Sequence, residues 1–384
     1  MREYDFLIIG AGIAGASVGY QLARGHKIAL LEREEQPGYH TTGRSIAVYT
    51  EAYGPHAIRA LAIAGGPFFK DPPKGFTEVP LCHPHGLMFV AREDQKKVLY
   101  DALAAVQPLS PEIHEISVDE AVKTVPVLRK DYLAACFLDP NTMALDVNAI
   151  HQGYLRGLKG AGGEVVCNAE AQSFERKGGK WIVKTPAGEF AAPVVINAAG
   201  AWADVIAERI GAKQIGLVPK RRTVIAFNPP AGVNGNHWPV VFDTEEEWYF
   251  KVDAGTVLGS PADETPSPPT DAQPEEMDIA LTIDRIERAT TFQIRRILRK
   301  WAGLRSFVMD GVPVAGYDPS VEGYFWLAGQ GGYGIETSVG LSRCAASLVT
   351  GKGLPDDVKA LKVTERDLAP MRLWDGTAKP AKGH

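Results

Sequence analysis

Cysteines are few in this sequence, and their spacing fits neither a metal site nor a redox pair. The 384 residues include four cysteines, which are Cys82, Cys136, Cys167 and Cys344. The absence of a Cys-x-x-Cys pair argues against zinc binding and thiol–disulfide chemistry. We therefore expect free thiols, no metal site and a cytoplasmic location, where thiols stay reduced.

Long apolar runs and blocks of basic residues are also missing. No run reaches 18 apolar residues, so we expect no transmembrane segment, and peripheral contact with the inner membrane stays open. An apolar strand is predicted to begin at Phe6, which leaves no room for a signal peptide. The net charge is −5 and no basic cluster occurs, so a nucleic-acid partner is not expected.

The sequence does contain a glycine pattern between two short apolar segments near its start. Residues 6–9 and 27–31 are predicted to be buried strands, and residues 16–23 a helix of small and apolar residues. The turn between the first strand and this helix reads Gly10-Ala11-Gly12-Ile13-Ala14-Gly15. This order of strand, glycine turn, helix and strand is typical of dinucleotide binding.

Each part of that unit has a physical role toward a dinucleotide. Gly10 permits the tight turn, Gly12 lets the backbone approach the pyrophosphate, and Gly15 lets the helix pack closely. The free N–H groups and partial positive charge of the helix N-terminus favour phosphates. Glu32, at the end of the second strand, can accept hydrogen bonds from the ribose hydroxyls. The alternative is a glycine-rich turn in another α/β unit, and the motif alone does not separate FAD from NAD(P).

Three further stretches can approach the same cofactor. A donor-rich loop follows the unit, and its other interpretation is a plain surface turn. Two more apolar strands each run into small residues and then a helix. The residues predicted to contact the cofactor are Gly10, Gly12, Ile13, Ala14, Gly15, Glu32, Arg33, Thr41, Thr42, Gly43, Arg44, Ser45, Ala199, Gly200, Trp202, Gly331, Gly332, Tyr333 and Gly334.

The remaining pattern predicts an α/β protein with a strand-rich middle section. Prolines and acidic residues predict a long exposed loop over 259–276. Residues 275–299 are predicted to form one long helix or two short ones, and a last helix is expected from about Ile335 to Thr350. Residues 45–56 are predicted to form a mobile cover over the site.

Several motifs together resemble the FAD-dependent amino-acid oxidoreductases of the D-amino-acid oxidase, glycine oxidase and sarcosine oxidase type. The likeness is greatest to the bacterial D-amino-acid dehydrogenases, D-arginine dehydrogenase among them. It covers nearly the whole chain, and the stretches that carry it are GAGIAGAS, LEREEQPGYHTTGRS, HQGYLRG, NAAGAWAD, PKRR, WAGLRSF and AGQGGYGIETS.

The resemblance implies two discontinuous domains and FAD as the cofactor. A Rossmann-like FAD-binding domain would comprise residues 1–45, 145–215 and 305–384. A mixed-sheet α+β substrate domain would comprise residues 46–144 and 216–304. In sarcosine-oxidase relatives a cysteine before the last helix holds the flavin covalently. Residues 329–334 contain no cysteine, so non-covalent FAD is expected.

The resemblance also implies which residues act on the substrate. Arg222 and Arg305 match positions that anchor the α-carboxylate, and the alternative is that each is a surface arginine. Tyr53 and Tyr249 match tyrosines that close over the substrate, with core packing as their alternative. The carbonyl of Gly332 would lie near the substrate amine.

Glu336 departs from the family pattern, which has a neutral amide at this position. It is predicted either to pair with the substrate ammonium or to cap the helix start, and these alternatives are held as equal.

The reaction implied is the oxidative deamination of a small-molecule D-amino acid. A hydride would move from Cα to flavin N5, and the imino acid would hydrolyse to a keto acid and ammonia. The electron acceptor is unknown, a quinone or another carrier. The residues expected to line the side-chain pocket favour apolar or neutral side chains and are Val48, Leu87, Val240 and Phe242. The alternatives are an oxidoreductase of glycine, sarcosine or another secondary amine, and a flavin-binding subunit without turnover.

Overall fold

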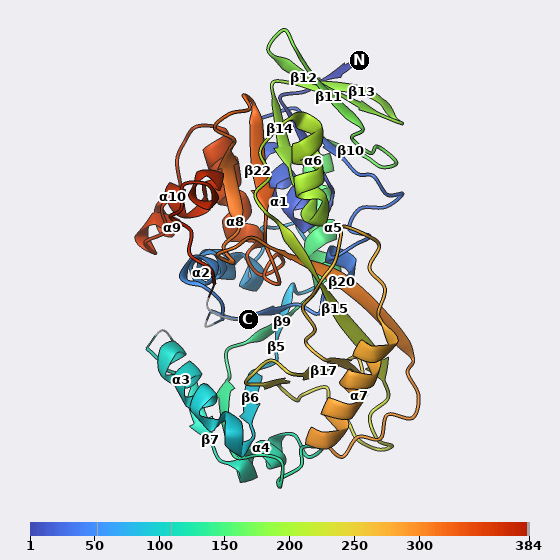
Figure 1. Cartoon of the computed structure of the whole chain (residues 1–384), viewed down its shortest axis with the longest axis vertical. Helices are drawn as coiled ribbons and strands as arrows, with labels where there is room; N and C mark the ends of the chain where they lie inside the picture. Colours follow the sequence, from blue (N-terminus) through green and yellow to red (C-terminus); the bar gives the residue numbers. More distant parts are fainter. Residues whose placement is uncertain (52, 109, 382–384) are drawn as a thin grey trace.

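The computed structural model describes residues 1–51, 53–108 and 110–381. A six-stranded sheet forms the centre of the upper part of the molecule in Figure 1. Residue 52, within the predicted cover over 45–56, lies outside the described residues. The strand order is β10-β3-β2-β14-β22-β21, with only β21 antiparallel to its neighbour. The bounds are β10 (Glu164–Val166), β3 (Ile28–Leu31), β2 (Phe6–Ile9), β14 (Val194–Asn197), β22 (Tyr324–Ala328) and β21 (Val314–Tyr317).

Both faces of this sheet are covered, which explains why its central strands are almost continuously apolar. One face packs against three helices through a shared core, and they are α1 (Ile13–Leu22), α5 (Val147–Gly160) and α8 (Ser338–Val349). The other face packs against α6 (Ala203–Ile210) and a four-stranded sheet. That sheet runs β1 (Arg2–Glu3), β13 (Gly188–Ala192), β12 (Lys180–Thr185) and β11 (Ser173–Lys177).

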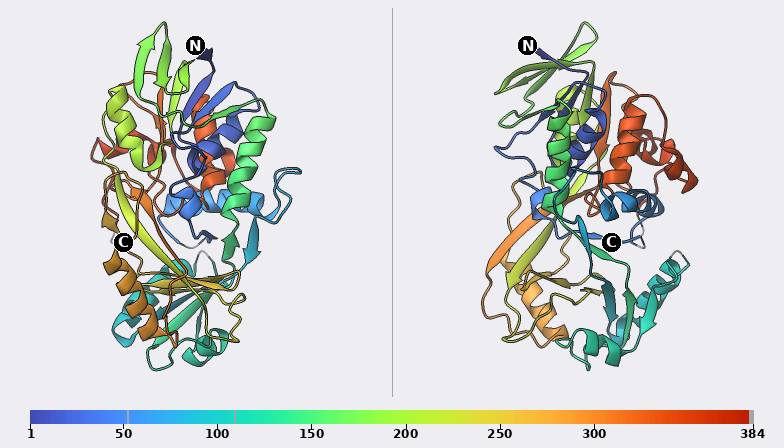
Figure 2. Two further views of the ribbon diagram at one scale, coloured as in Figure 1. Left: turned by 90° about the vertical axis from the view of Figure 1, so that its right-hand side faces the viewer. Right: turned by 180° about the vertical axis from the view of Figure 1, so that it is seen from behind.

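A nine-stranded mixed sheet forms the lower part of Figure 1. Its main path is β19 (Thr265–Pro266), β15 (Val218–Phe227), β18 (Thr256–Ser260), β17 (Tyr249–Asp253), β16 (Val240–Asp243), β6 (Leu87–Ala91), β8 (Ala135–Asp139) and β7 (His114–Ile116). The remaining strand, β20 (Arg299–Phe307), pairs with β15 along nearly its whole length. Helices flank this sheet in Figures 1 and 2, namely α3 (Lys96–Val106), α4 (Val118–Thr124) and α7 (Glu276–Ala289).

Smaller elements connect and cover the two large sheets. A three-stranded sheet lies between them and consists of β4 (Val48–Tyr49), β9 (Met143–Leu145) and β5 (Cys82–Pro84). The other elements are α2 (His56–Lys70), α9 (Asp356–Ala360), α10 (Glu365–Leu368) and the 3₁₀ turns η1 (Thr42–Arg44), η2 (Glu93–Gln95), η3 (Gly200–Trp202) and η4 (Pro370–Leu373). No helix in the described part of the chain is long and apolar enough to cross a bilayer.

The structure corrects three boundaries. The region 275–299 holds the single helix α7, because Thr290 is extended and Thr291 N donates to Val127 O, after which β20 begins at Arg299. The expected exposed loop over 259–276 is partly buried, since β19 pairs with β15 inside it and Ala272 is 4% exposed. The helix expected from about Ile335 is α8, which begins at Ser338.

Candidate active site

A cavity of about 310 Å³ lies between the two large sheets and draws its lining from both. Every residue predicted to contact cofactor or substrate lines it, with the exceptions of Gly15 and Gly43. Those two glycines act through packing, because a Cβ at Gly15 would overlap the carbonyl oxygen of Gly10 and a Cβ at Gly43 would lie 2.7 Å from Gly38 O. They order the turns from which other residues reach the cavity.

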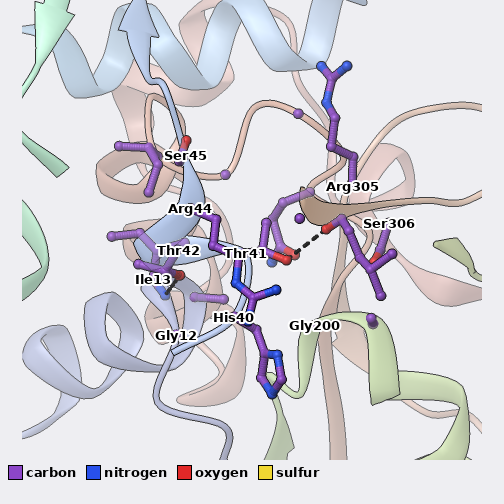
Figure 3. Close-up of a pocket in the computed structure, with 18 of the residues that line it drawn as sticks. Gly12, Ile13, His40, Thr41, Thr42, Arg44, Ser45, Gly200, Arg305 and Ser306 are labelled. Carbon is purple, nitrogen blue, oxygen red and sulfur yellow. Dashed lines mark hydrogen bonds between the residues drawn. The ribbon is translucent and has the colours of Figure 1, made fainter. Parts of the chain in front are cut away.

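A hydrogen bond connects the glycine turn to the loop after β3 at the N-terminus of α1. Gly10 has φ +99°, a conformation that favours glycine. The N–H of Ile13 donates to Thr42 Oγ1 at 2.9 Å, and Figure 3 shows this contact. No acidic residue belongs to the first turn of α1 itself, so the helix carries no negative charge of its own at its start.

Glu32 is 7% exposed and reaches the same turn from the end of β3. Its Oε2 accepts from the N–H of Ala11 at 2.8 Å, and its Oε1 accepts from the N–H of Glu34 at 3.0 Å. A carboxylate has about four acceptor sites, so two protein donors leave capacity for hydroxyl groups.

Aromatic and cationic side chains line the cavity next to this turn. The Arg33 guanidinium lies 5.0 Å from the ring centroid of Trp202, and the His40 ring lies 4.6 Å from it. In Figure 3, His40 and Gly200 lie at the end of the view opposite Arg305. These residues and Arg305 therefore line different sides of the cavity.

The loop between β3 and β4 also ties the cavity wall to β20. Thr41 Oγ1 donates to Leu304 O at 2.7 Å. Arg44 lines the cavity, but its guanidinium donates to the carbonyls of Ala272 and Ala302 and to Asp271. The charged end of Arg44 thus anchors the segment 259–276, and its contact with the cofactor stays a prediction.

The two predicted arginines converge on one carboxylate. Arg222 Nη2 lies 3.2 Å and Arg305 Nη1 lies 3.5 Å from Glu264 Oε1, and Lys220 Nζ lies 2.6 Å from Glu264 Oε2. Asp263 and Glu336 also interact electrostatically with Arg222 and Arg305, but each guanidinium has more N–H donors than these contacts use, which favours an anionic ligand. Sequence reasoning missed Glu264, because it treated the surrounding segment as an exposed loop.

Both predicted tyrosines lie beside these arginines. Tyr53 donates to Glu246 Oε1 at 2.5 Å, and its ring centroid lies 5.6 Å from that of Tyr333. The Tyr249 ring stacks on Phe242 at 4.9 Å, and the Arg222 guanidinium lies 5.9 Å from its centroid. Tyr249 thus both packs on a neighbour and faces the cavity.

The turn before α8 lines the same side of the cavity. A Cβ at Gly332 would overlap the Arg305 guanidinium, so only glycine leaves that arginine its place. Glu336 is 5% exposed, and its Oε2 accepts from the N–H of Thr50 at 3.3 Å. Burial raises the pKa of Glu336 to about 8, although the Thr50 N–H and Arg305 oppose the shift. The N-cap of α8 is Thr337 and no side chain caps it, so the capping alternative for Glu336 is not supported.

All four residues expected in the side-chain pocket line the cavity, but the same wall holds residues that the prediction missed. These are Phe89 on β6, Val224 on β15 and Lys251 on β17. A sequence signal for Lys251 existed, because alternate residues of a strand face the same side and Tyr249 was already placed there.

The lining fits FAD when each donor set is considered. The N-terminus of α1 and the glycines beside it suit a pyrophosphate, and Glu32 suits an adenosine ribose. Residues that would hold the other parts of the cofactor come from the 41–45 loop, the 199–202 turn and the 331–334 turn.

Comparisons with known proteins agree with this arrangement. Residues 5–348 match the family described as FAD dependent oxidoreductase, DAO. The chain is 25% identical to the uncharacterized oxidoreductase YurR of Bacillus subtilis, over 95% of this chain and 97% of that protein. It is 22% identical to the glycine oxidase of the same organism, over 93% and 95%. The structure of L-proline dehydrogenase from P. horikoshii superposes with a TM-score of 0.84 at 20% identity, over 98% and 99%. This chain therefore belongs to the DAO family of FAD-dependent oxidoreductases.

Proposed function

We propose that this chain oxidises D-amino acids, with the imino acid product hydrolysing to a keto acid and ammonia. The observation that carries the proposal is the convergence of Arg222, Arg305, Tyr53 and Tyr249 on one side of a cavity whose other side suits a dinucleotide. Bound FAD would supply the acceptor for the hydride from Cα. The electrons would then pass to an acceptor of unknown identity, a quinone or another carrier.

In this proposal the arginines fix the substrate by its α-carboxylate. A bidentate or paired arginine contact holds a carboxylate in one orientation, which presents a single Cα–H to the ring. Glu264 would keep the arginines in place, and their remaining N–H groups would be available to the ligand. The Tyr53 and Tyr249 hydroxyls would add hydrogen bonds and exclude water.

Glu336 and the Gly332 carbonyl would hold the substrate amine. With a pKa raised to about 8 by burial, Glu336 is mostly protonated at pH 7. A protonated carboxyl is neutral and both donates and accepts, as an amide does. The departure from the family's neutral amide would therefore be small below pH 8.

The pocket wall of Val48, Leu87, Val240 and Phe242 would contact the apolar part of the substrate side chain. It contains no acid, so a buried guanidinium would lack a partner, and D-arginine would be a poor substrate. We also propose the division into an FAD-binding domain (1–45, 145–215, 305–384) and a substrate domain (46–144, 216–304), and a cytoplasmic location.

Oxidation of glycine or of a secondary amine is the second candidate. A relative described as glycine oxidase and a structure described as L-proline dehydrogenase both favour it. The same carboxylate anchor would serve these substrates, so the arginines do not separate the two candidates.

The test is anaerobic reduction of the bound flavin by a panel of D- and L-amino acids, glycine, sarcosine and proline. Faster bleaching by a D-amino acid than by its L-enantiomer supports the proposal, because the enantiomers differ only in which bond faces the ring. Reduction by glycine, sarcosine or proline alone would favour the second candidate. A flavin that no member of the panel reduces would indicate a binding subunit without turnover.

A further inference from the structure

A lysine lies in the pocket wall that was expected to be apolar. Lys251 is 5% exposed and lines the cavity. It lies two residues beyond Tyr249 on β17, so both face the same side of the sheet, about 7 Å apart along the strand. Phe250, between them, points into the core on the other face. The strand geometry therefore explains why the side chains of Lys251 and Tyr249 line the same cavity.

The pairing of the strands puts Lys251 in one row with two predicted pocket residues. β16 and β17 pair antiparallel with Phe242 opposite Tyr249 and Val241 opposite Phe250, so the next position brings Val240 opposite Lys251. β16 and β6 pair with Val240 beside Leu87. The row Leu87, Val240, Lys251 thus runs across the wall, beside the row that contains Phe242 and Tyr249.

Lys251 has no carboxylate within ion-pair distance among the residues that the structure describes. Burial lowers its pKa, and the exposed Asp253 only partly opposes the shift. Nearby His85 carries no compensating negative charge, and its own pKa is lowered to about 4 by burial and by Lys251. A buried ammonium without a partner is costly, and an anionic ligand would offset the cost.

We propose that Lys251 binds a second carboxylate, at the end of the substrate side chain, so that the enzyme prefers acidic amino acids such as D-glutamate or D-aspartate. This inference rests on the proposed function for the orientation of the substrate. The α-carboxylate would lie on Arg222 and Arg305, and the methylene groups on Leu87 and Val240. The expected preference for neutral side chains then holds for the stem of the side chain and not for its end.

The first experiment measures anaerobic flavin reduction in the holoenzyme with D-glutamate and its near-isosteric neutral partner, D-glutamine. Wild type should be reduced more efficiently by D-glutamate. Lys251→Met should lower the efficiency with D-glutamate roughly 10- to 150-fold and change that with D-leucine less than about threefold. Lys251→Arg should restore part of the loss, and Lys184→Met, an exposed lysine on β12, should change nothing. If Lys251→Met lowers the efficiency of flavin reduction equally with D-glutamate, D-glutamine and D-leucine, the inference is overturned.

The second experiment tests the inference even if no amino acid reduces the flavin. Glutarate and butyrate are titrated into the oxidised holoenzyme, and binding is followed through the flavin absorbance. Wild type should bind glutarate at least tenfold more tightly than butyrate. Lys251→Met should retain FAD and bind the two acids with equal affinity. Equal affinities of the two acids in wild type would overturn the role of Lys251. Preferred glutarate binding without flavin reduction would instead refute the proposed reaction alone.

Discussion

At the scale of single residues, Arg305 has the most direct test. It lies in the cavity beside Arg222, and Gly332 leaves it room that any side chain would fill. We expect Arg305→Met to raise the substrate concentration needed and to slow flavin reduction, while FAD stays bound. The loss of a charge-assisted contact to the carboxylate should cost about 1.5–3 kcal/mol. Stopped-flow reduction as a function of substrate concentration measures both effects.

Two comparisons keep that result interpretable. Arg305→Lys retains the charge without the planar fork and should be impaired less than Arg305→Met. If Arg305→Met is reduced as fast as wild type at low substrate concentration, Arg305 has a structural role only.

The raised pKa of Glu336 leads us to expect that the stability of the protein depends on pH. Its folded pKa is about 8, above the value of 4.5 for an unperturbed glutamate, so the native state binds the proton more tightly than the unfolded state. Stability therefore falls as pH rises from 4.5 to about 8. The loss from this group is at most about 5 kcal/mol, at 1.36 kcal/mol per pKa unit.

Glu336→Gln removes the titration and keeps a neutral hydrogen-bonding group. Thermal unfolding of both proteins between pH 5 and 9 should show that the stability of the variant relative to wild type increases as pH rises. A constant difference across this range would mean that Glu336 is ionised at every pH in the native state.

At the scale of the elements, the crossing of α2 and α8 depends on a glycine. A Cβ at Gly340 would overlap the carbonyl oxygen of Leu61, so the two helices would have to move apart. Gly340→Ala should lower the free energy of unfolding by about 1–3 kcal/mol, as overpacking does. Gly160→Ala, at the end of α5, is the matched control, because nothing lies within 4 Å of its added Cβ. Equal stability of the two variants by denaturant unfolding would contradict the tight crossing.

At the scale of the whole molecule, FAD bound in the cavity would contact both large sheets. The described cavity lining contains no cysteine, so the flavin should be bound without a covalent bond. Acid or heat should release it as FAD, and added FAD should raise the Tm of the apoprotein by mass action. Chromatography of the supernatant after denaturation identifies the flavin. Colour that stays with the polypeptide would contradict non-covalent binding, and FMN would contradict the role given to Glu32.

The local parts of this protein could be predicted from the sequence. The unit from Phe6 to Glu32 depends on short-range rules, namely glycine conformation, apolar strands and helix packing, which neighbouring residues carry in full. The predicted mixed α/β fold is confirmed. The arginines and tyrosines could be predicted because they resemble family positions, and the structure places all four in the lining of one cavity.

Only the tertiary structure decided what surrounds those motifs. Glu264 meets Arg222 and Arg305 because β19 folds back on β15, and Glu336 gains its raised pKa from burial by distant segments. Lys251 joins Val240 and Leu87 in the pocket because β16 and β17, which are neighbours in sequence, pair with the distant strand β6. The sequence determined which local elements form, since those depend on neighbouring residues. Charge pairing and burial depend on contacts between remote segments, so they became visible only when the sheets were assembled.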